Sequence, residues 1–357
     1  MQKERIHKIL IILFFVQLFF VFLFSKFPSF IEKYYSNGIY VYVSSFFRTV
    51  FGWLPFSFGD LIYATLIILI IRFLVLFFKS NRAGKKPLAF EFLASFSIFY
   101  FLFYFSWGLN YSRVPLTSSL DFVSDSVSKE KLLFLTNKLL DKTKSIQIQI
   151  TGNDSIAVMV PYSKNEILKM APNGYQNLSQ NFEQFIYQPT SLKKSLFSVP
   201  LTYMGFAGYL NPITGEAQVD YLLPKISLPM TCSHEIAHQL GIASESEANF
   251  IGFLAAIHQE DLYFNYSAYL NALRYSLFDV YRFDPELYQN YLDDLPIGIQ
   301  KNILETENFW KSYKNPAEPV FKAFYNNYLK INQQEDGLRS YNKMVDLLIA
   351  FDQKYPL

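Results

Sequence analysis

Two histidines and a glutamate within five residues are the group in this sequence whose types and spacing best suit chemistry. They form the segment His234-Glu235-Ile-Ala-His238. Residues i and i+4 lie on one face of an α-helix, so both imidazoles can reach one metal ion. Glu235 directly follows the first histidine, in place to take a proton from a water at that metal. The spacing therefore predicts a metal-dependent hydrolytic centre, with His234 and His238 as ligands and Glu235 as general base.

A centre of this kind needs a third protein ligand and an open position for water. Glu245 and Glu247 follow closely on a strongly apolar segment, where an acidic side chain is best explained by a neighbouring cation. Gly241 can end the first helix and Ser244 can cap the next one. Glu245 would then lie in the first turn of the second helix, and we favour it as the ligand. A later helix start would bring Glu247 to the metal instead.

Other residues around this motif offer weaker signals. Cys232, the single cysteine, and His258 suit buried or hydrogen-bonded positions without a role in catalysis. Tyrosines between Tyr263 and Tyr269 are candidates for stabilising an oxyanion. Residues 201–223 resemble a β-hairpin with a turn at 211–215. Its edge strand would suit pairing with an extended peptide, and the alternative is a hairpin that only covers the core.

The elements that position these residues divide the chain of 357 residues into two parts. Hydrophobic residues make up 51% and charged residues 17%, below the roughly 25% charged residues of soluble domains. The apolar excess lies in residues 1–110. We expect transmembrane helices over about 9–26, 58–78 and 89–110. An extracytoplasmic loop over 27–57 is expected to connect the first two.

The distribution of basic residues predicts the orientation of these helices. Basic side chains cluster before the first span and after the second, and such clusters remain in the cytoplasm. The amino end is then cytoplasmic, and residues 111–357 form an extracytoplasmic domain. The lipid bilayer is thus the expected partner, and the net charge of +2 without a nucleic-acid-binding motif argues against a nucleic-acid partner. The basic residues are Lys3, Arg5, Lys8, Lys79, Arg82, Lys85 and Lys86.

Apolar periodicity in residues 111–357 predicts a domain that is mainly α, with a small β-hairpin or sheet. The alternation of Gln and Ile over 146–150 predicts a short strand. Helices are expected over 129–142, 175–186, 271–281, 305–313, 319–331 and 341–351.

The motif and its surroundings resemble two known families. His234-Glu-Ile-Ala-His238 followed by Glu245-Ser-Glu-Ala-Asn249 is similar to the gluzincin pattern of membrane-associated zinc peptidases of the HtpX type and of ImmA-like peptidases. That resemblance implies a zincin-like domain, a zinc ion (Zn²⁺) as cofactor, Glu245 as ligand and Asn249 as the residue that orients a ligating histidine. The gap between His238 and Glu245 is shorter than is usual in gluzincins.

More of the chain resembles an uncharacterised family of three-span membrane proteins from Bacteroidota and Firmicutes. The similarity includes the stretch 203–218 and the His-Glu-Ile-Ala-His-Gln-Leu-Gly and Glu-Ala-Asn-Phe segments. It implies a protein of the bacterial cytoplasmic (inner) membrane. Together the two resemblances imply a membrane-anchored zinc metallopeptidase that acts on a peptide or protein substrate. The alternatives are a non-catalytic binding or scaffolding protein with a structural metal site, and a zinc hydrolase that cleaves cell-wall amide bonds.

Overall fold

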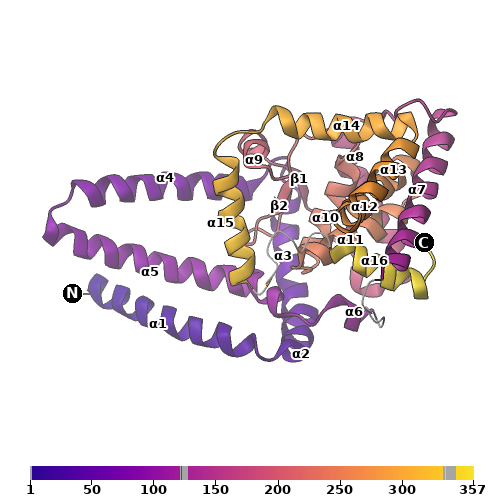
Figure 1. Ribbon diagram of the computed structural model, residues 1–357. Coiled ribbons are helices and arrows are strands. Elements are labelled where there is room, and N and C mark those ends of the chain that lie inside the picture. Colours follow the sequence, from indigo (N-terminus) through magenta and orange to yellow (C-terminus); the bar gives the residue numbers. More distant parts are fainter. Residues whose placement is uncertain (1, 121, 123–127, 333, 335–342) are drawn as a thin grey trace. The chain divides into compact units, whose positions relative to one another are not determined.

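The computed structural model describes residues 2–120, 122, 128–332, 334 and 343–357, and it is mainly helical, as expected. The described chain forms two compact units (Figure 1). One unit contains residues 1–114 together with 211–216, and the other contains 115–210 and 217–357.

Three helices of the first unit are long and apolar enough to cross a membrane, as in a multi-pass membrane protein: α1 (Gln2–Phe24), α4 (Phe58–Lys79) and α5 (Arg82–Ser106). This confirms the expectation of three apolar spans. Near the start of both helices Lys3 pairs with Glu91, at 3.3 Å, and further along both of them the Ser97 hydroxyl donates to the Leu10 carbonyl, at 2.7 Å. Helices α1 and α5 therefore run parallel to one another.

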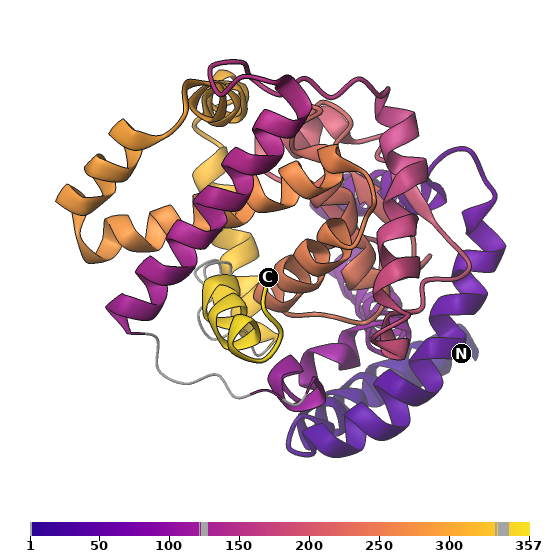
Figure 2. The ribbon, with the colours of Figure 1, turned by 90° about the vertical axis from the view of Figure 1, so that its right-hand side faces the viewer.

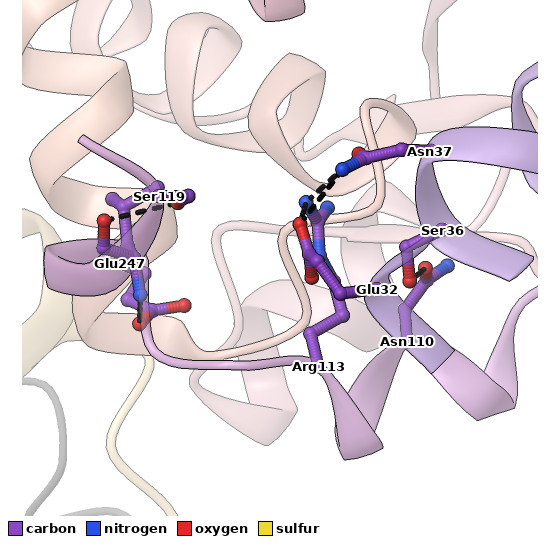
Figure 3. Close-up of polar contacts among 8 residues, drawn as sticks. Glu32, Ser36, Asn37, Asn110, Arg113, Ser119 and Glu247 are labelled. Atoms are coloured by element: carbon purple, nitrogen blue, oxygen red, sulfur yellow. Dashed lines mark hydrogen bonds and ion pairs between the residues drawn. The ribbon is translucent and has the colours of Figure 1, made fainter. Parts of the chain in front are cut away.

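The segment between the first two long helices is also helical, consisting of α2 (Pro28–Phe30), the π-helix η1 (Ile31–Ile39) and α3 (Tyr40–Gly52). Polar contacts tie η1 to the chain that follows α5, which includes the 3-10 helix η2 (Gly108–Ser112). The Arg113 guanidinium donates to both oxygens of Glu32, at 2.7 and 2.9 Å, and Ser36 donates to Asn110 at 2.9 Å (Figure 3). A paired arginine with two parallel hydrogen bonds is the strong form of ion pair.

The turn at residues 211–216 belongs to this first unit. Its Glu216 carboxylate accepts hydrogen bonds from the backbone N–H groups of Phe58, at 3.2 Å, and Gly59, at 2.6 Å. Backbone N–H groups in the first turn of a helix have no carbonyl partner within the helix, so the Glu216 carboxylate caps α4. Its negative charge also interacts favourably with the positive end of the helix dipole.

The second unit places its core around two central helices, α10 (Leu228–Gln239) and α11 (Glu245–Ile257). Helices α8 (Lys164–Leu178) and α12 (Leu262–Phe283) pack against both of them. The C-terminal helix α16 (Lys343–Lys354), yellow in Figure 2, packs against α11, α12 and α7. The remaining elements are α6 (Leu116–Ser119), α7 (Lys129–Thr151), the 3-10 helix η3 (Glu183–Phe185), α9 (Ser198–Met204), α13 (Pro285–Asp294), α14 (Ile297–Ser312) and α15 (Glu318–Ile331).

A small sheet accompanies α10, with the strand order β1 (Leu192–Lys194), β3 (Ala217–Val219), β2 (Gly208–Leu210). β3 is parallel to β1 and antiparallel to β2, so β2 is an edge strand. The hairpin expected over 201–223 is therefore present but shorter. Its first residues are helical in α9, and each strand has only three residues.

Two expectations about local structure are wrong. Residues 146–150 are not a strand but the end of α7, because Ile146 and Ile150 are four residues apart and share the helix face that packs inward. The helix expected over 175–186 begins earlier, at a capping box formed by Ser163 and Glu166, and ends at Leu178. The expected helices over 129–142, 271–281 and 319–331 are confirmed, and that over 305–313 is confirmed except that α14 ends one residue earlier, at Ser312. The helix expected over 341–351 is present from residue 343, with 341 and 342 outside the described residues.

Candidate metal centre

Helix α10 brings the two histidines of the motif together. It begins at Leu228 with Pro229 in its first turn, and the chain leaves it at Gly241, whose φ of 82° is left-handed. His234 and His238 lie one turn apart on the same face, and their Nε2 atoms are 3.1 Å from one another. The predicted helical spacing of the histidines is therefore present.

Helix α11 returns alongside α10 and brings in Glu245 as its first residue. The helices approach closely at Gly252, where a Cβ atom would lie 2.8 Å from the backbone nitrogen of His234. Glu245 Oε2 lies 3.3 Å from His234 Nε2 and 3.5 Å from His238 Nε2. Ligand atoms 2.0–2.1 Å from a tetrahedral zinc ion lie about 3.3 Å from one another. The buried His234, His238 and Glu245 form a group that can hold a metal ion.

Glu247 points to a different part of the same unit. Its Oε1 atom accepts a hydrogen bond of 2.7 Å from the backbone N–H of Leu116, the first residue of α6 (Figure 3). The carboxylate thus caps a short helix. The structure brings Glu245, and not Glu247, to the two imidazoles.

The outer ring nitrogens of the two histidines have different surroundings. His238 Nδ1 donates to the carbonyl of Ile242, at 2.7 Å, which leaves Nε2 to accept or to bind a metal. His234 Nδ1 and the Asn249 amide nitrogen are buried and have no hydrogen-bond partner among the described residues. Asn249 lies beside Tyr275, a tyrosine whose pKa is raised to about 12 by burial. The orienting role of Asn249 stays a prediction.

Tyr325 of helix α15 is a member of the group that the sequence did not suggest. Its hydroxyl donates to Glu245 Oε1 at 2.6 Å, and its ring packs edge-to-face against Phe206. The other carboxylate oxygen, Oε2, is the one that faces the histidines. Tyr325 is 80 residues away from Glu245 in sequence, among 26 tyrosines, and no local pattern marks it.

The tyrosines expected to approach the metal make other contacts. The Tyr266 hydroxyl donates to Asn302, the Tyr263 ring packs against Tyr162, and the Tyr269 ring packs against Phe253. His258 and Cys232 also lie outside the group. Ring nitrogen Nδ1 of His258 hydrogen-bonds to the Leu254 carbonyl, and Cys232 is a free, buried thiol.

Glu235 of α10 is buried, and its side chain lies against the edge strand β2. A Cβ atom on Gly208 would lie 2.5 Å from Glu235 Oε1 and 2.6 Å from the backbone oxygen of Gln218, so this close approach requires a glycine. The Oε2 atom of Glu235 has no hydrogen-bond partner within the part of the chain that the structure describes. Burial raises the pKa of this carboxyl to about 7, well above its ordinary value of 4.5. Such a group can take up and release a proton near neutral pH.

The charges of the three candidate ligands support one another in the absence of a metal. Burial by itself disfavours a charged imidazole, but the Glu245 carboxylate outweighs this and raises the pKa of His238 to about 9. Burial also disfavours the Glu245 carboxylate, but the facing imidazoles hold its pKa well below the ordinary value. A buried carboxylate that remains ionised beside two imidazole nitrogens is a donor set suited to a divalent cation.

Residues 35–349 match a family described as protein of unknown function (DUF3810). The chain belongs to this family. The match includes the whole of the candidate metal group as well as α4 and α5. This agrees with the expectation of an uncharacterised membrane protein family. No match was found among curated proteins or among solved structures.

Proposed function

We propose that the protein is a membrane-anchored, zinc-dependent peptidase with Glu235 as general base. The observation that carries the proposal is the arrangement of His234 Nε2, His238 Nε2 and Glu245 Oε2, which lie 3.1–3.5 Å from one another. These two nitrogens and one carboxylate oxygen would hold a zinc ion with three protein ligands and would leave a further position for water. An open position is typical of catalytic sites, whereas structural sites use four protein ligands.

Zinc at this position would supply an electrophile that polarises a carbonyl group and makes water more acidic. The protein's own contributions come from residues around it. Tyr325 and the Ile242 carbonyl hold two of the ligands in orientation through the 2.6 Å and 2.7 Å hydrogen bonds. Glu235 accepts the proton of the attacking water and passes it to the leaving amine. The raised pKa of this buried carboxyl supports that exchange near neutral pH.

The edge strand β2 supports a peptide as the substrate. Gly208 of this strand lies directly against Glu235, and β2 pairs with β3 on one side only within the described sheet. An extended peptide that adds to such an edge forms main-chain hydrogen bonds and is held in a fixed register. Pairing here would place the peptide's main chain beside the general base.

We further propose that the amino end is cytoplasmic and that the catalytic domain is extracytoplasmic, in a bacterial inner membrane. In the first unit α1 and α5 run parallel, so the start of α1 and the turn between α4 and α5 lie at one end of the apolar helices. The seven basic residues named above all lie at or near that end. Basic residues are enriched on the cytoplasmic side. A reporter fused after Leu357 that functions only in the cytoplasm should be inactive, and an active reporter would invert the orientation.

The test of the function uses the full chain purified in detergent. Metal analysis should find one zinc ion per chain, lost in His234→Ala. Glu235→Gln should retain the zinc ion but abolish peptide hydrolysis, while Glu260→Gln, at an exposed position, should change neither. Comparative proteomics of cells that carry wild-type or Glu235→Gln protein identifies substrates as proteins that accumulate in the variant.

The same variants separate the proposal from its alternatives. A chain that binds zinc but leaves the proteomes identical is a binding or scaffolding protein with a structural metal site. Zinc-dependent changes confined to cell-wall fragments point to an amidase. Absence of stoichiometric zinc, or zinc retained in His234→Ala, refutes the site itself.

A further inference from the structure

Helix α15 has two opposite faces with different surroundings within its own unit. On one face Tyr325 contacts Glu245, and Leu329 is fully buried. On the opposite face Val320, Phe324 and Ile331 are 69%, 74% and 78% exposed. At 100° per residue these three side chains lie within about 40° of one another and more than about 90° from Tyr325 and Leu329. The helix therefore exposes an apolar stripe that nothing in the described chain covers.

The ends of α15 are attached to the second unit on both sides. Before the helix, the Asn315 amide donates to the Tyr203 carbonyl of α9, at 2.7 Å. After the helix, the Gln334 amide donates to the Ala243 carbonyl, at 2.7 Å, in the connection between α10 and α11. The stripe is thus held in place from both ends.

The charge around this stripe is positive. Four lysines lie within residues 311–331. Lys311 pairs with Glu307 and Lys322 pairs with Glu318, so the positive charge near the stripe comes from Lys314 and Lys330. An apolar face with phenylalanine and lysine side chains near it are features of helices that lie in the interface of an anionic membrane. Each basic residue near such a surface contributes about 1 kcal/mol of attraction.

We propose that the outer face of α15 docks on the surface of an anionic lipid bilayer, as an interfacial helix. The three apolar spans of the same chain keep this surface at high local concentration, so even weak docking is favoured. A second copy is a poorer occupant, because a stable dimer buries about 800 Å² on each partner and the stripe consists of a few side chains on a helix of 14 residues. The helix would then join the bilayer to the candidate metal centre, with Tyr325 on its inner face. This inference is independent of catalytic activity.

The chain is well suited to a test with single cysteines. Its only cysteine, Cys232, is fully buried, and burial raises the pKa of its thiol, so a maleimide label reacts elsewhere. We would introduce Phe324→Cys and, separately, Ile331→Cys, and attach an environment-sensitive fluorophore. Phe134→Cys on α7 is the matched control, since Phe134 is 65% exposed and lies on another element of the same unit.

The labelled full-length proteins are placed in nanodiscs of phosphatidylcholine with phosphatidylglycerol. A fraction of the lipids carries a nitroxide quencher near the headgroup end of the acyl chain, because interfacial helices lie about 5–10 Å into this boundary. The fluorophores at 324 and 331 should lose most of their intensity, and the one at 134 should lose little. Removal of phosphatidylglycerol should weaken the quenching at 324 and 331.

Quenching at 324 and 331 that is no stronger than at 134 overturns the proposal. The same holds if the two labels are shielded from aqueous iodide without lipid quenching, which indicates protein as the occupant. Energy transfer between labelled copies in one nanodisc then identifies a second chain. Equal quenching with phosphatidylcholine alone overturns the requirement for anionic lipid.

Discussion

The hydroxyl of Tyr325 provides the sharpest test of the candidate metal centre. Tyr325→Phe removes one oxygen atom and retains the ring that packs against Phe206. The lost interaction is the 2.6 Å hydrogen bond to Glu245 Oε1. Because Oε2 is the atom that faces both imidazoles, this hydrogen bond selects which carboxylate oxygen is offered to the metal. The variant leaves all three ligands and Glu235 in the chain.

The size of the effect follows from the type of hydrogen bond. A hydrogen bond to a charged group contributes about 1.5–3 kcal/mol, and every 1.4 kcal/mol corresponds to a factor of about ten in affinity. Glu245 is buried and ionised, so little water can replace the lost donor. We therefore expect the zinc affinity of Tyr325→Phe to fall by about 10–100-fold, the range found when groups that orient metal ligands are changed.

Zinc affinity is measured by competition with a fluorescent chelator at fixed pH, on the full chain in detergent. Tyr203→Phe is the matched control, because Tyr203 lies on the neighbouring α9 and is about half exposed. Thermal unfolding of the metal-free proteins checks that both variants fold. An affinity of Tyr325→Phe within twofold of the control, with both proteins folded, would refute the view that this tyrosine orients the ligand.

Three further predictions concern the ligands, their charge and the approach of the edge strand. Glu245→Gln should lose its zinc on dialysis, whereas Glu247→Gln should keep it and lose about 1 kcal/mol of stability through the weakened cap of α6; equal zinc contents would contradict this. The pKa of His238 is about 9 in the folded metal-free protein, above its unfolded value of about 6.5. Its contribution to stability is therefore complete below pH 6.5 and lost as the pH rises through 9, while zinc affinity rises over the same range because the metal takes the neutral ring. Thermal unfolding and zinc titration between pH 6 and 9 should thus change in opposite directions, and a common direction would count against the assignment. Gly208→Ala should lower the free energy of unfolding by about 1–3 kcal/mol in a denaturant titration, since the added Cβ meets the backbone oxygen of Gln218 as well as Glu235; an unchanged value would show that the contact is loose.

Features set by local pattern could be read from the sequence. The three apolar helices follow from composition and length alone, because a bilayer requires about 20 apolar residues whatever the fold. The joint placement of His234 and His238 follows from the helical repeat, which puts residues i and i+4 on one face. Gly241 ends α10 in the conformation that glycine adopts without strain.

The sequence pattern gave a wrong prediction where the same arrangement of apolar residues fits both a strand and a helix. The alternation over 146–150 fits a strand, but Ile146 and Ile150 also fit a helix face, and the preceding amphipathic helix simply continues through them. The hairpin was recognised from its turn, but turn chemistry carries no information about strand length. Neighbouring packing decides such cases.

The composition of the metal group beyond the two histidines depends on tertiary structure. Glu245 and Glu247 both follow the motif, and their roles differ because the packing of α11 at Gly252 sets the rotation of that helix. Tyr325 reaches Glu245 across 80 residues of sequence. Periodicity describes which residues share a face of one element, whereas a site built from several elements depends on how their faces meet. Residue types and spacing thus determined the chemistry of the motif, whereas helix packing determined that Glu245 and Tyr325 join the two histidines.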